Sequence, residues 1–492
     1  MIQINFKEDK IFIFLLVFIL CTASILRLYN LNYDDLWADE IFSFWVSDPS
    51  ITIKDTLLRA FSSSLNFFFD VGLKYFHLIF DYDVYISRYF SLLISILSLV
   101  LFTFLLLKIT SKQSVIFGIF ILSVNLYHIK YSQELRSYIL TFFFTLIFIL
   151  LNFKEKETYT KFNFFNFLLS IIIIFLMYCN HAFTILIVFS FVFYETLKML
   201  KEKKINKNSI LLIASYAFLT LIFLIFYYQT TLKFIDPETM NGLSLNWLEL
   251  PKASFYTNFY FSEFFGSRIL GLIHLLILLF SIFKFREELF LKNFNIYTFF
   301  VFLIFFSYTI PLIYSYLFGP VLLGRYLVFL LIPIILLLSH FIFELENKIL
   351  KYSFVTLIAL TTIVNHFLYE NTFKQFYTKP FYTKPQVRQS LELINNSDIK
   401  NLTIKMLNKD LNHTNDVYEN YIIKYLEKKK FDINYYNYKE NNFQPNQTWM
   451  IYFRDITNDS FTVPKEFKNY EILKKKQLNR ITLVLLRTNT NN

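Results

Sequence analysis

Long apolar stretches separated by short polar segments make up most of the chain before residue 370. Many of these stretches are roughly 20 residues long, the length that a helix needs to cross the hydrocarbon core of a bilayer. The pattern therefore predicts a polytopic α-helical membrane protein with about eleven membrane-spanning helices. The predicted spans are residues 11–28, 89–107, 115–126, 138–151, 162–178, 182–197, 210–228, 269–283, 297–317, 327–343 and 354–368.

Residues 33–83, between the first two predicted spans, form a more polar region. Within it, residues 65–80 are mostly apolar but include Asp70, Lys74 and His77. Charged groups at these positions fit a helix that lies in the membrane interface better than a helix that crosses the membrane. We therefore expect interfacial helices in this first loop.

Lysine residues indicate the orientation of the spans. Lys7 and Lys10 precede the first span, and the strongest cluster, from Lys198 to Lys207, follows the sixth. Because loops rich in lysine stay in the cytoplasm, we expect the N-terminus inside and the first loop outside. The first span has no clear small-residue cleavage site, which favours a permanent anchor over a signal peptide. The prediction is a multi-pass protein of the cell (inner) membrane.

The end of the chain differs from the rest because it is polar and rich in Asn, Lys and Tyr. An odd number of spans would place it outside the cytoplasm. The chain is therefore expected to divide into a transmembrane domain, residues 1–370, and an extracytoplasmic α/β domain, residues 371–492. Helical spacing occurs at residues 386–395, and strand-like runs occur at 402–406, 449–453 and 481–486.

Composition agrees with a membrane protein and excludes several other classes. The 492 residues are 55% hydrophobic and 17% charged, with only 7 Gly, and the mean hydropathy is +0.44. The net charge of +11 comes from lysines in short loops, so nucleic-acid binding is not expected. No glycine-rich phosphate-binding motif appears, which argues against an ATP-driven pump. Cys21 and Cys179 lie in apolar segments and provide no disulfide framework.

Residues 36–43, Leu-Trp-Ala-Asp-Glu-Ile-Phe-Ser, place two acids directly behind a tryptophan just after the first span. Two acids among aromatic residues beside a membrane need either a function or contact with water. In the simpler interpretation, Trp37 anchors the segment while Asp39 and Glu40 face water. In the other, the two acids belong to an active site.

Three further polar groups are predicted on the same outer face. Polar loop ends that simply face water would give the same residues. Together with Asp39 and Glu40, however, the groups number four, and four polar groups on one face indicate a site. The three groups are Gln133-Glu134-Leu135-Arg136, Asn180-His181 and Gly324-Arg325-Tyr326.

A synthetic enzyme outside the cytoplasm has no nucleotide sugars or ATP available, so it must use an activated lipid such as a polyprenyl-phosphate sugar. Glycosyl transfer from this donor needs a carboxylate to take the acceptor proton and a cation to stabilise the leaving phosphate. Asp39 or Glu40 would supply the carboxylate. Arg325, with His181 or Arg136, would supply the positive charge.

Six segments carry a family resemblance. They are RLYNLNYDDLWADEIFS, DVYISRYFSLLISILS, HIKYSQELRSYIL, YCNHAF, GPVLLGRYLVFLLIP and YTKPQVRQSLELI. In this order they resemble bacterial glycosyltransferase family 39 and its relatives, which include protein O-mannosyltransferases and the lipid A aminoarabinose transferase. These are membrane glycosyltransferases of the GT-C fold, and the resemblance covers roughly residues 20–395.

The resemblance implies the GT-C fold, with a catalytic acid in the first outer loop and a second acid in the next. It makes Asp39 the catalytic carboxylate, with Glu40 beside it, and Glu134 the second acid. Glu134 would either orient the acceptor or share a divalent metal ion with Asp39. Arg325 matches an arginine that meets lipid phosphate, and His181 matches a family histidine. The predicted substrate-binding residues are Gln133, Arg136, His181, Arg325 and Tyr326.

The chain departs from many relatives at the start of an interfacial helix, where Ser62, Ser63, Ser64, Leu65 and Asn66 replace His-Pro-Pro-Leu-Tyr. We expect an enzyme that transfers a sugar from a polyprenyl-phosphate donor to a lipid, glycan or protein at the outer face of the cytoplasmic membrane. Single displacement with inversion is the expected course. The alternatives are a catalytically inactive scaffold of the same fold and a lipid or polysaccharide transporter, although the sequence shows no inverted repeat.

Overall fold

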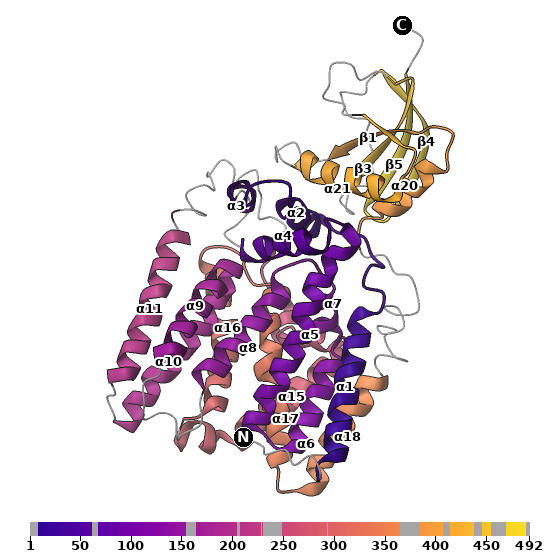
Figure 1. Cartoon of the computed structure of the whole chain (residues 1–492). Coiled ribbons are helices and arrows are strands. Elements are labelled where there is room, and N and C mark those ends of the chain that lie inside the picture. Colours follow the sequence, from indigo (N-terminus) through magenta and orange to yellow (C-terminus); the bar gives the residue numbers. More distant parts are fainter. Residues whose placement is uncertain are drawn as a thin grey trace. The chain divides into compact units, whose positions relative to one another are not determined.

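The chain forms two compact units in the computed structural model, and each is described by itself (Figure 1). Unit 1 comprises Met1–Tyr29, Leu57–Phe69 and Phe90–Lys379, and unit 2 comprises Asn30–Thr56, Asp70–Tyr89 and Pro380–Asn492. The structure describes residues 8–61, 67–153, 164–203, 207–227, 229, 248–292, 294–364, 384–406, 414–436, 445–453 and 469–488. The predicted domain boundary at residue 370 lies outside these ranges, as do residues 230–247.

Each predicted span overlaps a helix of the described residues. Six described helices are long and apolar enough to cross a membrane by themselves, or seven if one bent pair counts as a single span, so the predicted number of about eleven is not confirmed. The chain is nevertheless a multi-pass membrane protein. The helices are α1 (Lys10–Leu28), α5 (Val84–Ile109), α6 (Lys112–Ser123), α8 (Tyr138–Asn152), α9 (Phe164–Asn180), α10 (Ile185–Glu202), α11 (Lys207–Tyr227), α15 (Arg268–Lys284), α16 (Ile296–Leu317), α17 (Leu331–Glu344) and α18 (Lys348–Val364).

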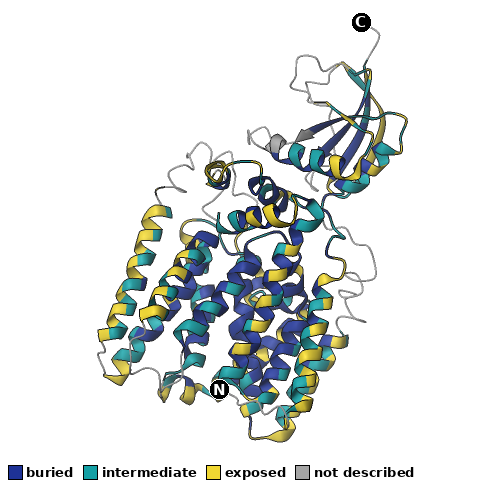
Figure 2. Ribbon diagram, viewed as in Figure 1, coloured by how far each residue is buried: buried dark blue, intermediate teal, exposed yellow. Residues whose placement is uncertain are grey.

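Helix α17 lies at the centre of unit 1. Every residue from 327 to 339 is buried, and the helix packs against α6, α15 and α16. Helix α11 shows the opposite pattern, with Tyr216 as its buried residue and apolar side chains exposed along its length (Figure 2). Exposed apolar surface of this extent is unfavourable in water and suits contact with lipid.

The bent pair is α6 and α7 (Leu126–Ser132), whose axes meet at 59°. Asn125 caps α7, because its side-chain oxygen accepts from the His128 N–H at 2.8 Å. The buried Arg27 of α1 donates to the carbonyl groups of Leu122 and Ser123 at 2.9 and 3.0 Å, and thereby satisfies the end of α6. This break directs α7 and the turn after it toward the polar groups described below.

A short irregular segment of unit 1 precedes α15. It contains α13 (Ala253–Asn258) and α14 (Phe261–Phe265), joined by two residues in the left-handed region, Phe259 at φ 48° and Tyr260 at φ 64°. Such backbone conformations are unfavourable for residues with side chains. Gly271 of α15 allows the close packing, because a Cβ there would come within 2.5 Å of the Phe261 backbone. Short 3₁₀ helices η2 (Ala182–Thr184) and η6 (Gly324–Leu330) and the π-helix η5 (Glu287–Leu291) complete unit 1.

Unit 2 combines segments from both ends of the chain. Its first segments include α2 (Ala38–Val46) and most of α4 (Phe68–Phe80), the helix predicted at residues 65–80, while α3 (Ile53–Phe61) begins in this unit. Tyr82 links the segments, because its hydroxyl lies 3.0 Å from the Phe44 carbonyl and 3.0 Å from the Asn420 side-chain oxygen. The aromatic rings of Phe44 and Tyr82 also stack at 4.2 Å.

The C-terminal part of unit 2 contains a five-stranded sheet in the order β2-β1-β3-β5-β4. Strand β1 pairs with β2 and β3 in parallel, and β5 pairs with β3 and β4 in antiparallel fashion. The predicted helix and three predicted strands are confirmed as α20, β1, β3 and β5, whereas α21, β2 and β4 were not predicted. The elements are α20 (Val387–Asn395), β1 (Asn401–Met406), α21 (Thr414–Lys429), β2 (Asn434–Tyr435), β3 (Gln447–Phe453), β4 (Tyr470–Leu478) and β5 (Ile481–Thr488).

Candidate functional site

The acid pair of unit 2 lies in the first turn of α2. Trp37 is the N-cap residue, and its backbone N–H donates to Glu40 Oε2 at 3.1 Å. Asp39 is partly exposed in the same turn, where the partial positive charge of a helix N-terminus stabilises a carboxylate. Burial and the charge of Asp39 raise the pKa of Tyr418, so the two side chains lie near each other.

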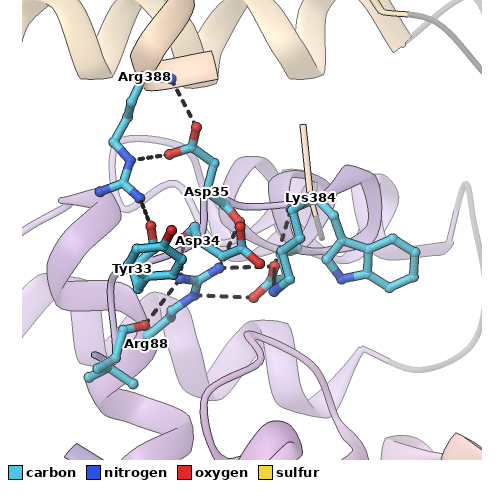
Figure 3. Close-up of polar contacts among 9 residues, drawn as sticks. Tyr33, Asp34, Asp35, Arg88, Lys384 and Arg388 are labelled. Atoms are coloured by element: carbon cyan, nitrogen blue, oxygen red, sulfur yellow. Dashed lines mark hydrogen bonds and ion pairs between the residues drawn. The ribbon is translucent and has the colours of Figure 1, made fainter. Parts of the chain in front are cut away.

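Glu40 is fully buried, and its two carboxylate oxygens are held by two cations, Arg88 and Lys384, which are labelled in Figure 3. Arg88 donates from Nε to Oε1 at 3.3 Å and from Nη2 to Oε2 at 3.2 Å. Lys384 donates to Oε2 at 2.6 Å. A buried carboxylate needs such partners because removing it from water is costly. The structure therefore gives Glu40 contacts that fix α2, whereas its neighbour Asp39 keeps access to solvent.

Arg88 also fixes the turn that leads into α2. Its guanidinium donates to the backbone carbonyl groups of Leu31, Asp34 and Asp35 at 3.2, 2.6 and 2.9 Å. The fork of donors on an arginine suits such multiple contacts. One buried side chain thus connects the turn at residues 31–35 to the helix that carries Asp39.

A second buried ion pair joins this turn to α20. The Arg388 backbone N–H donates to Asp35 Oδ2 at 2.9 Å, and the guanidinium binds Asp35 Oδ1 and the Tyr33 carbonyl (Figure 3). Burial raises the pKa of Asp35 above its ordinary value, although the Arg388 charge and hydrogen bonds lower it. Since Lys384 and Arg388 both bind the first loop, the two segments form one structure.

Arg88, Lys384 and Arg388 were not predicted as site residues. They occur in the segments DVYISRYF and YTKPQVRQ that carry the family resemblance. Nothing in their immediate sequence separates them from other membrane-flanking cations. Their partners lie 48 to 355 positions away along the chain.

In unit 1, residues from the three predicted groups of this unit come together around aromatic rings. The rings of His181 and Tyr326 lie 5.0 Å apart, and those of Tyr138 and His181 lie 5.9 Å apart. The Arg325 guanidinium lies 5.5 Å from the Tyr326 ring and 6.0 Å from the Tyr138 ring. Aromatic faces favour a cation at these distances.

His181 is buried and carries no positive charge at neutral pH. Burial, followed by the charges of Arg136 and Arg325, lowers its pKa to about 3. Its Nδ1 accepts from the Phe183 N–H at 3.2 Å, so the ring proton lies on Nε2. His181 can therefore donate one hydrogen bond, but the positive charge of this cluster comes from Arg136 and Arg325. His181 and Arg136 were the two candidates for a second positive charge beside Arg325. Because His181 is neutral, the structure favours Arg136.

The other predicted residues of this cluster, Gln133 and Glu134, make different kinds of contact. Gln133 donates from Nε2 to the carbonyl groups of Arg27 and Tyr29 at 2.8 and 2.9 Å, so its amide anchors the turn to α1. Glu134 is buried, and its carbonyl accepts from the Arg136 N–H at 2.9 Å. Glu134 also interacts electrostatically with Tyr131.

Sequence analysis did not identify Glu263 of α14. Its carboxylate lies against Gly324, because a Cβ at that glycine would overlap Glu263 Oε2. Partial removal from water raises the pKa of Glu263, while the positive charge of Lys130 lowers it. Glu263 therefore lies beside the segment that begins with Gly324 and Arg325.

No three His, Cys, Asp or Glu side chains in the described part of the chain are placed to hold a metal ion. Asp39 belongs to unit 2 and Glu134 to unit 1, so their predicted shared metal stays a prediction. With no such group among the described residues, no reaction step is assigned to a metal ion. Ser62, Ser63 and Ser64 lie outside the described residues.

Comparison with known proteins identifies the fold. No family model and no curated protein matches the sequence. The structure of ArnT, a lipid A aminoarabinose transferase, from Cupriavidus metallidurans bound to undecaprenyl phosphate matches with a TM-score of 0.51 and 10% identity, over 97% of this chain and 98% of that chain. Its apo form gives 0.51 and 9%, over 96% and 97%. The chain therefore shares the GT-C fold with ArnT.

Archaeoglobus fulgidus oligosaccharyltransferase is a more distant match. Its complex with Zn and sulfate gives a TM-score of 0.45 at 12% identity, over 77% of this chain and 55% of that chain. Its complex with an inhibitory peptide and a dolichol-phosphate gives 0.48 at 11%, over 91% and 70%. This chain thus spans only about half to two thirds of the oligosaccharyltransferase.

Proposed function

We propose that the protein transfers a sugar from a polyprenyl-phosphate donor to an acceptor outside the cytoplasm. The observation that carries this proposal is the cluster in unit 1, where Arg136 and Arg325 lie near a neutral His181. Two arginines near a neutral hydrogen-bond donor, with Arg325 also beside aromatic rings, suit a phosphate monoester or diester. The GT-C fold supports the same assignment, since ArnT with this fold has been observed with undecaprenyl phosphate.

In the proposed reaction, an acceptor hydroxyl attacks the anomeric carbon of the donor sugar. Asp39 takes the hydroxyl proton as general base while the new glycosidic bond forms. The bond between the anomeric carbon and the phosphate oxygen breaks, and polyprenyl phosphate leaves with the bonding electrons. Arg325 and Arg136 stabilise the charge that develops on this phosphate. Glu40, held by Arg88 and Lys384, positions the helix that carries Asp39.

The direct test uses the purified protein in proteoliposomes with a panel of polyprenyl-phosphate sugars, radiolabelled in the sugar, and cell-envelope extract as acceptor. Movement of label from the lipid to the extract is the expected result. Movement of intact labelled lipid between leaflets, without transfer, would instead identify a transporter. Binding of the donor with neither outcome would identify an inactive scaffold.

The Arg325 side chain is expected to contribute to both donor binding and turnover. Arg325→Lys should lower both, and Arg325→Ala should lower them further, because lysine keeps the charge but loses the planar fork of donors. A lost charge-assisted hydrogen bond typically weakens binding by about 10- to 100-fold. Donor titration and initial rates measure both effects.

Arg268→Ala is the matched control, because Arg268 is an exposed arginine of the same unit at the start of α15. It should leave donor affinity and turnover unchanged. Normal donor kinetics in Arg325→Ala would contradict the phosphate assignment, and an interfacial arginine that only reaches toward water would give that result.

The orientation in the membrane is also a testable part of the proposal. A reporter inserted after Lys203 should be active only in the cytoplasm, because the lysines from 198 to 207 mark an inner loop. A reporter inserted after Asp398 should be active only outside. A cytoplasmic signal from the second reporter would exclude an extracytoplasmic acid pair.

A further inference from the structure

A pocket with a volume of about 280 Å³ lies in unit 1 beside the segment that leads to Arg325. Its wall is formed by residues 249–252, by α13 and α14 with the residues between them, and by Leu322 and Leu323. Pockets for drug-sized ligands typically have volumes of about 300–1,000 Å³, so this pocket suits a smaller group such as a single sugar ring.

The polar side chains of the pocket are held in place by bonds within its own wall. Ser262 donates to the Asn258 side-chain oxygen at 3.1 Å, and Asn258 donates to the Ser254 carbonyl at 2.7 Å. The Tyr260 hydroxyl donates to the Leu322 carbonyl at 3.0 Å. Left-handed backbone at Phe259 and Tyr260 gives the wall its shape, and such conformations are concentrated at functional sites. The pocket is therefore preformed.

Glu263 is the acidic group of this pocket that lies nearest to the Arg325 segment. Its side chain is open to solvent and forms part of the pocket lining. The carboxylate also contacts Gly324, the residue before Arg325. Two carboxylate oxygens can accept hydrogen bonds from two neighbouring hydroxyl groups. Aromatic side chains at the same wall, Phe255 and Tyr260, can cover the apolar face of a sugar ring.

We propose that this pocket binds the sugar of the donor lipid and that Glu263 accepts hydrogen bonds from its hydroxyl groups. The inference rests on the proposed function, in which Arg325 holds the donor phosphate. The donor sugar is bonded to that phosphate, so it must lie within a few ångströms of the Arg325 segment, where Glu263 is found. The acceptor has no such covalent link to the phosphate. Glu263 is then a specificity-determining residue of the donor site.

The test compares two ligands that differ only in the sugar. Wild-type protein and Glu263→Gln are titrated with polyprenyl phosphate and with a polyprenyl-phosphate hexose in the same detergent. Glu263→Gln should bind polyprenyl phosphate normally and the sugar lipid about 10- to 100-fold more weakly, because hydrogen bonds to a charged group are lost. Glu287→Gln, at an exposed glutamate of η5 in the same unit, should bind both lipids normally.

A second variant moves the carboxylate without removing it. Gly324→Ala places a Cβ where Glu263 Oε2 now lies, so the Glu263 side chain must turn away. Affinity for the polyprenyl-phosphate hexose, relative to affinity for polyprenyl phosphate, should therefore fall as it does in Glu263→Gln. Double replacement should then add little, since both changes remove the same contact.

The outcomes separate this inference from the proposed function. Equal weakening of both lipids in Glu263→Gln would make Glu263 a structural support of the phosphate site, and no change in either would exclude it as a sugar ligand. In both cases the phosphate site would stand. If the wild-type protein bound neither lipid, the proposed function itself would be wrong.

Discussion

Replacing Asp39 with asparagine is expected to lower turnover by about 10²- to 10⁴-fold, the usual contribution of a general base. Asparagine keeps the size of the side chain and can still lie in the first turn of α2, but it cannot take a proton from the acceptor. Donor affinity should stay near the wild-type value, because Arg325 and Arg136 are unchanged. Initial rates at saturating donor and a separate donor titration measure the two quantities.

Asp398→Asn provides a matched control for this change. Asp398 is an exposed aspartate of the same unit, and its replacement should leave turnover unchanged. Turnover near the wild-type level in Asp39→Asn would move the catalytic role to another carboxylate. A fall in donor affinity alone would instead indicate that Asp39 contributes to binding.

The second large effect concerns stability. Arg88→Met is expected to lower the free energy of unfolding by about 3–5 kcal/mol, because it removes a cation from a buried carboxylate and leaves several carbonyl groups without a donor. Chemical denaturation of the purified protein measures this loss. Adding Glu40→Gln to Arg88→Met should restore part of it, since the buried charge is then removed with its partner.

Lys428→Met is the control for this prediction. Lys428 forms ion pairs with Asp83 at 2.9 Å and Asp81 at 3.7 Å within the same unit, but it is about half exposed. Exposed pairs contribute little to stability. If Arg88→Met unfolded at the same denaturant concentration as Lys428→Met, the network around Glu40 would not be a major source of stability.

Much of the membrane part could be predicted from the sequence, because a helix that crosses a bilayer must be long and apolar whatever its neighbours are. The helical core at residues 327–339 was visible as an apolar run for that reason. Several strands of the C-terminal sheet were visible because they are buried, apolar and rich in β-branched residues. Helix α21 and strand β4 were missed because Asn, Lys and Tyr obscure their periodicity, as in the run of lysines at 474–476.

The candidate site was only partly predictable. Trp37, Asp39 and Glu40 drew attention because acids are rare beside apolar segments, and Arg325 did so as an arginine at the start of a span. The difference between partly exposed Asp39 and buried Glu40 was not visible, because it depends on Arg88 and Lys384, which are distant in the sequence. Glu263 was missed for a similar reason, since its pocket is formed only when the α13 and α14 segment meets Leu322.

The separation of Glu40 and Lys384 along the chain also matters for the order of synthesis. The two residues are 344 positions apart, and a ribosome that adds roughly 5–20 residues per second needs about 17–70 s to cover that distance. During this interval Glu40 has Arg88 as a partner, but neither Lys384 nor Arg388 exists yet. The helix that carries Asp39 therefore reaches its final environment only after Lys384 and Arg388 have been translated, so nascent chains halted before that point would lack a finished acid pair.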